Sequence, residues 1–182
     1  MSAILDALVI ERRNGVTAYE ALLAKYIDLV KNVQYPENNA AYGNKNSLAL
    51  SGAKAILTVR KDSTPAQREN FVREWYRDLL KAEVARLLPK WEQITGLRPD
   101  GWQTKYMTTR WGTCNTTTRK LWLNLQLAKK TPECLEYIIL HELIHLAEKN
   151  HNERFVSLMD KYMPMWREVK ATLNGQTLDF ME

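Results

Sequence analysis

Cysteine is scarce in this chain of 182 residues, and the two that occur, Cys114 and Cys134, lie twenty residues apart. They form no C-x-x-C pair, so neither a disulfide framework nor a thiolate metal site is indicated. Long apolar runs are also lacking, because no stretch approaches the roughly 20 residues of a membrane-spanning helix. The start of the chain has Asp6 inside its only apolar stretch and no basic leader before it. These absences predict a cytoplasmic protein with reduced thiols and no membrane segment.

Dense runs of one charge are lacking as well. The formal net charge is +5, but the Lys and Arg residues are spread along the whole chain. A positive balance would suit an anionic partner such as a nucleotide or a nucleic acid. A solvated surface is the simpler explanation of such a modest, dispersed charge. Nucleic-acid binding therefore has little support from the sequence.

Histidine is equally scarce, yet all of it lies in one place. The three histidines, His141, His145 and His151, fall within the stretch HELIHLAEKNH. His141 and His145 are four residues apart, so on a helix they project from one face a single turn apart. With Glu142 after the first, this is the H-E-x-x-H arrangement, in which two imidazoles bind zinc and the glutamate is the general base. The alternative, a buried helix with hydrogen-bonded core histidines, gives no reason for the clustering.

His151 can reach the same ion only if the helix ends before it. At about 100° per residue, an unbroken helix would carry His151 about three turns beyond His141. The helix is therefore predicted to end near Lys149 or Asn150, since asparagine tolerates the left-handed conformation that ends helices. Asn152 can then cap a following helix, which leaves His151 at the bend. Three imidazoles leave the fourth position of a tetrahedral zinc site open for water.

The N-terminal part of the chain is predicted to be helical and accessory. A capping box and an apolar stripe at helical spacing predict a helix over residues 17–32. Residues 33–46 are rich in Asn, Gly and Pro, which is typical of a linker. Two short apolar runs, residues 47–50 and 55–60, predict a β-hairpin.

A long helix is predicted to follow the hairpin. Thr64 is its cap, Pro65 is its first residue, and Gln67 completes a capping box. An apolar and aromatic stripe follows, which is typical of a helix that packs on a core. The helix should stop or kink at Pro89.

The apolar period changes from helical to twofold before the histidines. Leucine alternates with other residues over residues 121–127, the pattern of a strand with one face on the core. Residues 101–108 are its expected partner. If the 121–127 strand lies beside the active-site cleft, its free edge could pair with an extended peptide, with Trp122, Asn124 and Gln126 facing that peptide.

The helix that carries the histidines has its own start signal. Thr131 is the expected cap, and Pro132 is the expected first residue. Glu133 and Glu136 follow in the first turns, where the helix dipole favours negative charge. The apolar residues from Tyr137 onward predict that this helix is buried.

Four segments in order resemble the YgjP-like metal-dependent hydrolases, which are small relatives of the minigluzincin and SprT-like metallopeptidases. The segments are RWGTC at 110–114, LWLNLQL at 121–127, PECLEYIILHELIHL at 132–146 and NHNERF at 150–155. Thr113 stands where the family usually has serine, so the hydroxyl is kept. Metzincins share the spacing of the last two histidines, but Glu148 replaces their glycine.

This resemblance implies an α+β protein with a minimal zincin-like fold, in which a small, mostly antiparallel sheet packs against helices. It implies Zn²⁺ as the cofactor, with Glu142 as the general base and with three zinc ligands, His141, His145 and His151. Residues 1–45 do not resemble the strands with which the family usually opens. We therefore expect a helical N-terminal extension and linker over residues 1–45 and a hydrolase domain over residues 46–182.

The expected activity is zinc-dependent hydrolysis, with a peptide or an unfolded protein as the substrate. Tyr137 and the 111–115 loop are the candidates for stabilising the developing oxyanion. Should His151 not be the third ligand, Glu168 is the next candidate, because gluzincins use a downstream glutamate.

Two other functions remain open at this point. The same site could act as a zinc-dependent nucleotide phosphohydrolase, a pyrophosphatase, which would need converging cations near the ion. The candidates for that set are Arg110, Arg119, Lys120, Lys105 and Arg154. A non-catalytic zinc or DNA-binding module would need neither Glu142 nor an open ligand position.

Overall fold

The computed structural model describes residues 42–43, 46–51, 54–60 and 62–175. The chain forms two compact units that divide between Tyr76 and Arg77. The helix predicted over residues 17–32 lies outside the described residues, as does the predicted extension apart from Tyr42 and Gly43. The boundary between extension and hydrolase domain therefore stays a prediction.

The first unit contains the predicted hairpin. Strands β2 (Ser47–Ser51) and β3 (Lys54–Arg60) pair antiparallel, with Leu48 opposite Leu57. The short strand β1 (Tyr42–Gly43) pairs parallel with β3, so the strand order is β1-β3-β2. The prediction of a hairpin from two short apolar runs is confirmed.

Helix α3 (Pro65–Thr95) begins in the first unit and continues into the second. Its capping box is confirmed, because the Thr64 N–H donates to Gln67 Oε1 at 2.9 Å and the Gln67 N–H donates to Thr64 Oγ1 at 3.3 Å. Gly96, at φ 74°, has the left-handed conformation that commonly follows a helix.

Of the predicted stop or kink at Pro89, the stop is wrong, because α3 continues through that residue for another turn and a half. Trp91, only 5% exposed, extends the buried face of the helix beyond the proline. Full burial of a large apolar side chain contributes about 2–3 kcal/mol, which is comparable to the cost of about 3 kcal/mol for proline inside a helix. Tertiary packing thus offsets the missing backbone hydrogen bond.

The sheet of the second unit has the order β4-β6-β5. Strand β4 (Gly101–Lys105) pairs parallel with the central strand β6 (Lys120–Asn124), and β5 (Gly112–Asn115) pairs antiparallel with it. The strand predicted over residues 121–127 is shorter than expected, since the chain passes at Asn124 into a 3₁₀ helix, η1 (Leu125–Lys129). The Asn124 side chain causes this change by accepting a hydrogen bond from the Gln126 N–H at 3.1 Å.

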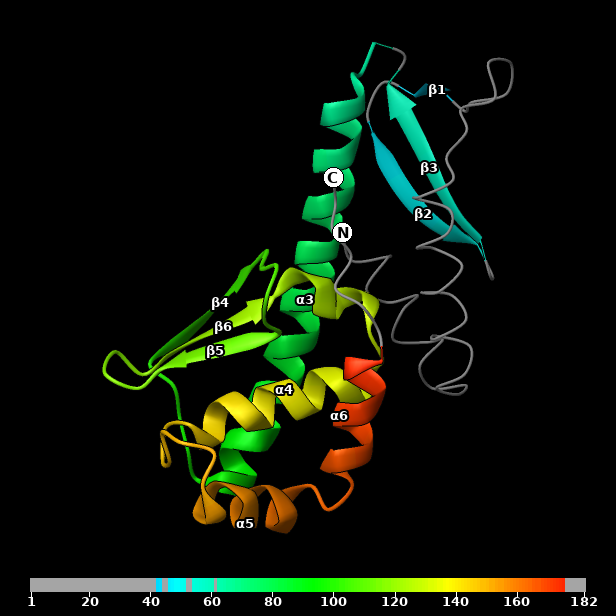
Figure 1. Cartoon of the computed structure of the whole chain (residues 1–182). Helices are drawn as coiled ribbons and strands as arrows, with labels where there is room; N and C mark the ends of the chain where they lie inside the picture. The colour runs from blue at the N-terminus through cyan, green and yellow to red at the C-terminus, as the bar shows by residue number, and fades with distance from the viewer. Residues whose placement is uncertain (1–41, 44–45, 52–53, 61, 176–182) are drawn as a thin grey trace. The chain divides into compact units, whose positions relative to one another are not determined.

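Three further helices complete the second unit: α4 (Pro132–Ile144), α5 (Glu153–Tyr162) and α6 (Trp166–Asn174). Helix α4 contacts β5, β6, η1, α5 and α6, so it lies between the sheet and the C-terminal helices (Figure 1). It starts as predicted, with Thr131 at the cap position and Pro132 first, although the Thr131 hydroxyl makes no capping hydrogen bond.

The fold class is α+β, as predicted, with small sheets and helices in one chain. In the described part of the chain, no helix is long and apolar enough to cross a membrane.

Candidate metal centre

Helix α4 ends at Ile144, about one turn earlier than the predicted end near Lys149 or Asn150. The chain leaves it through tight turns, in which the Leu146 and Ala147 N–H groups each donate at 2.9 Å to carbonyl oxygens three residues back. Asn150 does not adopt the predicted left-handed conformation, since Arg119 is the only described non-glycine residue with positive φ. The segment after Leu146 is polar, and it offers the core little apolar surface that would extend the helix.

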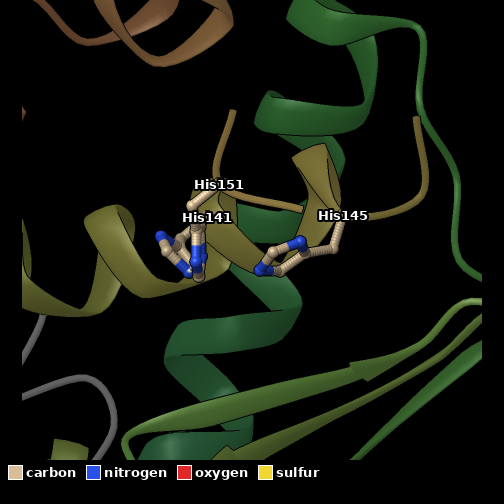
Figure 2. Close-up of side chains that lie close together, drawn as sticks. All are labelled: His141, His145 and His151. Atoms are coloured by element: carbon tan, nitrogen blue, oxygen red, sulfur yellow. Dashed lines mark hydrogen bonds between the residues drawn. The ribbon is translucent and has the colours of Figure 1, made fainter. Parts of the chain in front are cut away.

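The expected bend at His151 is nevertheless present. Asn152 caps α5, as predicted, with its Oδ1 accepting from the Phe155 N–H at 3.0 Å. His141 lies in the last turn of α4, His145 directly follows that helix, and His151 comes from the segment between α4 and α5 (Figure 2). One ring nitrogen from each lies within 4.8 Å of the others. The helical spacing and the bend therefore bring the three predicted imidazoles together.

The ring nitrogens are arranged as lone-pair donors. His145 Nδ1 lies 3.1 Å from the Glu148 carbonyl oxygen, which can only accept, so Nδ1 carries the hydrogen and Nε2 keeps its lone pair. Burial, together with the charges of the other two imidazoles and of Lys170, lowers the pKa of His141 to about 3, so this ring is neutral near pH 7.

The spacing of these nitrogens fits a bound transition-metal ion. His141 Nε2 and His151 Nε2 are 3.0 Å apart. Two ligands at about 2.0–2.1 Å from a tetrahedral zinc ion would be about 3.4 Å apart. His141 Nδ1 is buried and has no hydrogen-bond partner in the described part of the chain, which is a feature found at functional sites. A donor set of three imidazoles suits zinc and neighbouring transition metals.

Phe155 forms an apolar backing for all three imidazoles. Its ring centroid lies 4.9 Å from those of His141 and His145 and 4.6 Å from that of His151, and its side chain is only 2% exposed. The sequence identified Phe155 only as the last residue of the NHNERF segment. Its proximity to the cluster follows from the bend, which places the first turn of α5 against the end of α4.

Glu142 lies on the buried side of the same helix. Its side chain is 4% exposed, and burial raises the pKa of its carboxyl to about 8, against a lowering effect of Arg110. Strand β5 runs very close to it, since a Cβ on Gly112 would lie 2.6 Å from Glu142 Oε1 and 2.9 Å from Ile138 Cγ2. The sequence placed Gly112 only in the 110–114 segment of the family resemblance and did not predict this close approach.

A cavity of about 530 Å³ opens beside these groups. Its lining includes the predicted Arg110, Trp111, Tyr137, His141, Glu142 and His151. It also includes residues of α6, Trp166 and Lys170 among them, for which the sequence carried no functional signal. Burial raises the pKa of Tyr137 to about 12, with Glu142 adding to the effect, so the phenol stays protonated and can donate a hydrogen bond.

The predicted peptide-binding edge on the 121–127 segment is wrong. Strand β6 is the central strand, with β4 on one side and β5 on the other. Asn124 and Gln126 are buried, and Asn124 Nδ2 donates to the carbonyl oxygens of Met107 and Arg110 at 2.8 Å each. In the described sheet, the edge strand in contact with α4 is β5.

The converging cations expected for a nucleotide site do not assemble. Of the five Lys and Arg candidates, only Arg110 lines the cavity. Arg119, for example, lies 3.5 Å from Asp100 and donates to the Arg98 carbonyl oxygen. Glu168, the alternative third ligand, is exposed and is not part of the described metal-ligating cluster.

An α+β fold with three imidazoles and a buried glutamate around one helix end is an arrangement typical of metal-dependent hydrolases. The model of the YgjP-like family, metallopeptidase domain, matches residues 25–176. The chain therefore belongs to the YgjP-like metallopeptidase family. The match begins inside the predicted N-terminal extension.

Two solved structures are similar to part of the chain. The metallopeptidase zymogen of Pyrococcus abyssi abylysin is 20% identical, with a TM-score of 0.48 over 50% of this chain and 92% of that one. The metallopeptidase zymogen of Methanocaldococcus jannaschii jannalysin is 25% identical, with a TM-score of 0.39 over 55% of this chain and 94% of that one. No curated protein matches the chain.

Proposed function

We propose that this chain is a zinc-dependent metallopeptidase in which His141, His145 and His151 hold the ion and Glu142 is the general base. The observation that carries the proposal is the convergence of three imidazole nitrogens within 4.8 Å, next to a cavity that Glu142 also lines. Membership of a metallopeptidase family supports a peptide or unfolded-protein substrate. Of the five cations predicted for a nucleotide site only Arg110 lines the cavity, so the nucleotide alternative gains no support from that set.

When bound, a zinc ion would supply a Lewis acid that activates water and polarises the substrate carbonyl. Glu142 accepts the proton from the attacking water and returns it to the amine that leaves. Its carboxyl suits this role because burial raises its pKa above that of an exposed glutamate, which makes the carboxylate a stronger base. A general base with a pKa near the working pH is effective in both proton transfers.

Developing negative charge on the substrate oxygen needs a hydrogen-bond donor. Tyr137 lines the cavity next to His141, with the two ring centroids 5.7 Å apart, and its phenol is protonated at neutral pH. Backbone N–H groups of the 111–115 segment are the other candidates, since Trp111 and Gly112 also line the cavity. Either arrangement provides a fixed donor at the point where charge develops.

Strand β5 is the proposed docking edge for an extended peptide. Within the described sheet it pairs only with β6, and it contacts α4 on the cavity side. A peptide that adds to this edge gains backbone hydrogen bonds whatever its sequence. This location replaces the edge that the sequence suggested on residues 121–127.

The test is to incubate the zinc-loaded protein with an unfolded protein and, in parallel, with nucleoside triphosphates. We expect cleavage of the unfolded protein only, and we expect Glu142→Gln to lose it by about 10² or more while it keeps its zinc content. His151→Ala should lose most of its stoichiometric zinc in metal analysis.

Three results would contradict the proposal. One is activity of Glu142→Gln within a few fold of the unmodified chain. Another is tight, stoichiometric zinc in His151→Ala, and the last is hydrolysis of nucleotides alone.

A further inference from the structure

Trp166 is held in place by three helices at once. Its indole stacks on Tyr137 of α4, with an interplanar angle of 4° and ring centroids 6.3 Å apart. Its Nε1–H donates to Asp160 Oδ1 of α5 at 2.7 Å. The Arg167 guanidinium lies 4.6 Å from the centre of the ring, and Lys170 Nζ lies 5.7 Å from it. Trp166 is half-buried, and these contacts fix the orientation of its indole.

This fixed indole forms part of the wall of the cavity beside the histidines. The other apolar and aromatic members of the lining are Trp111, Tyr137, Ile138, Phe155, Val156 and Leu173. Tyr137 links the histidine cluster to this wall, because its ring centroid lies 5.7 Å from that of His141 and 6.3 Å from that of Trp166. The apolar part of the cavity therefore adjoins the position of the bond to be cleaved.

The size of the cavity suits one side chain and its flanking backbone. Its volume of about 530 Å³ lies within the range of about 300–1,000 Å³ that is usual for small-ligand pockets. Apolar, aromatic walls favour a bulky apolar group, since its transfer from water contributes about 25 cal/mol per Å² of buried area. Arg110 and Lys170 are the cations of this lining, and they oppose the entry of a basic side chain.

We infer that this cavity binds a bulky apolar side chain of the peptide substrate next to the cleaved bond, and that Trp166 determines this specificity. Asp160 is the positioning residue that orients the indole. The inference rests on the proposed peptidase function, because it concerns the selection of substrate by the same site. The inference is based on Trp166, which lines the cavity and contacts Tyr137 of α4 and Asp160 of α5. The cations Arg167 and Lys170 of α6 lie against the same ring.

The first experiment maps the bonds that the zinc-loaded full chain cleaves in an unfolded protein, by mass spectrometry. We expect Phe, Tyr, Leu or Met to be enriched at one position beside the cut, with Lys and Arg depleted there. Cleavage with no such enrichment, or with a preference for basic residues, would overturn the inference and leave the peptidase function intact. If the protein and its Glu142→Gln variant are equally inactive, the proposed function fails, and the inference fails with it.

The second experiment compares two peptides that differ only by Phe or Ala at the enriched position. In Trp166→Ala, the ratio of the two kcat/KM values should fall by about tenfold or more. Thr172→Ala is the matched control, because Thr172 is an exposed residue of the same helix that does not line the cavity. This control should keep the ratio of the unmodified chain. A Trp166→Ala variant with normal zinc content and an unchanged ratio would overturn the role of Trp166.

Trp166→Phe provides an answer if the alanine variant does not fold. Its ring can still stack on Tyr137, but it is smaller and lacks the N–H that donates to Asp160. We expect the preferred substrate residue at the enriched position to change from Phe toward Trp, because the smaller ring leaves more room in the cavity. An unchanged preference in this variant would also overturn the inference.

Discussion

Gly112 is the residue that allows strand β5 to approach the proposed general base. A side chain there would meet Glu142 Oε1 at 2.6 Å and Glu142 Cγ at 2.9 Å, closer than real Cβ contacts. Gly112→Ala should therefore displace the carboxylate and reduce kcat by about 10- to 100-fold, since small misplacements of reacting groups carry costs of this order. The zinc content should be unchanged, because none of the three histidines is touched.

Gly101→Ala is the matched control for this prediction. Gly101 lies in β4 of the same sheet, and an added Cβ there would have no atom within 4 Å. Its kcat should equal that of the unmodified chain. A normal kcat in Gly112→Ala would mean that strand β5 shifts to accommodate the added methyl group and Glu142 does not move.

The two cysteines are predicted to be unreactive near neutral pH. Burial and the charge of Glu142, opposed by Arg119, raise the pKa of Cys114 to about 11. Burial also raises the pKa of Cys134. Only the thiolate reacts with iodoacetamide, and a raised pKa means that less thiolate is present at a given pH. Labelling of the folded protein should thus be slow at pH 7–8 and accelerate as the pH rises toward 11.

The unfolded protein is the reference in this labelling experiment. In denaturant both thiols should react at rates typical of a free cysteine, with a pKa of about 8.5. Rapid labelling of Cys114 in the folded protein at pH 7 would contradict the predicted shift.

At the level of elements, Asn124 connects the end of β6 to the segment that lines the cavity. Its side chain is fully buried, and its Nδ2 donates to the Met107 and Arg110 carbonyl oxygens at 2.8 Å each. Its Oδ1 accepts from the Met107 N–H at 3.3 Å and from the Gln126 N–H at 3.1 Å. These bonds fix the position of Arg110, which lines the cavity together with residues of α4.

Asn124→Asp should destabilise the protein by about 3 kcal/mol, measured by chemical unfolding, because two carbonyl oxygens would face a carboxylate without a donor. Asn115→Asp is the matched control. Asn115 is exposed, and its Oδ1 accepts from the Thr117 and Thr118 N–H groups, a role that a carboxylate oxygen can keep. A loss of similar size in both variants would mean that Asn124 has no special role.

At the level of the whole molecule, the proposed centre is drawn from one part of the chain. Every residue of the cavity and of the histidine cluster lies between Arg110 and Asn174, within the second compact unit. We therefore predict that deletion of residues 1–40 leaves a folded, zinc-binding protein. Circular dichroism and metal analysis would test this directly.

A shorter deletion locates the boundary more closely. The family match begins at residue 25, so a chain without residues 1–24 keeps the whole matched region. If this shorter deletion is folded while removal of residues 1–40 gives an insoluble or metal-free protein, the extension predicted over residues 1–45 contains part of the core. The prediction of a separate extension would then be wrong.

The features that the sequence determined by itself depend on interactions within a few residues. The capping box of Thr64 and Gln67, the cap at Asn152 and the helical spacing of His141 and His145 all have this character. Their geometry follows from the backbone conformation of one turn, whatever surrounds it. For that reason the closeness of the three imidazoles could be predicted from the sequence, even though the predicted end of α4 was about one turn too late.

Only the tertiary structure decided the features that join distant segments. The strand order β4-β6-β5 makes β5 the edge beside α4, turns Asn124 inward and brings Gly112 against Glu142. The stack of Trp166 on Tyr137 joins residues 29 positions apart, and no local period encodes such a contact. These arrangements depend on packing, because burial of apolar surface stabilises contacts between residues however far apart they are in the sequence.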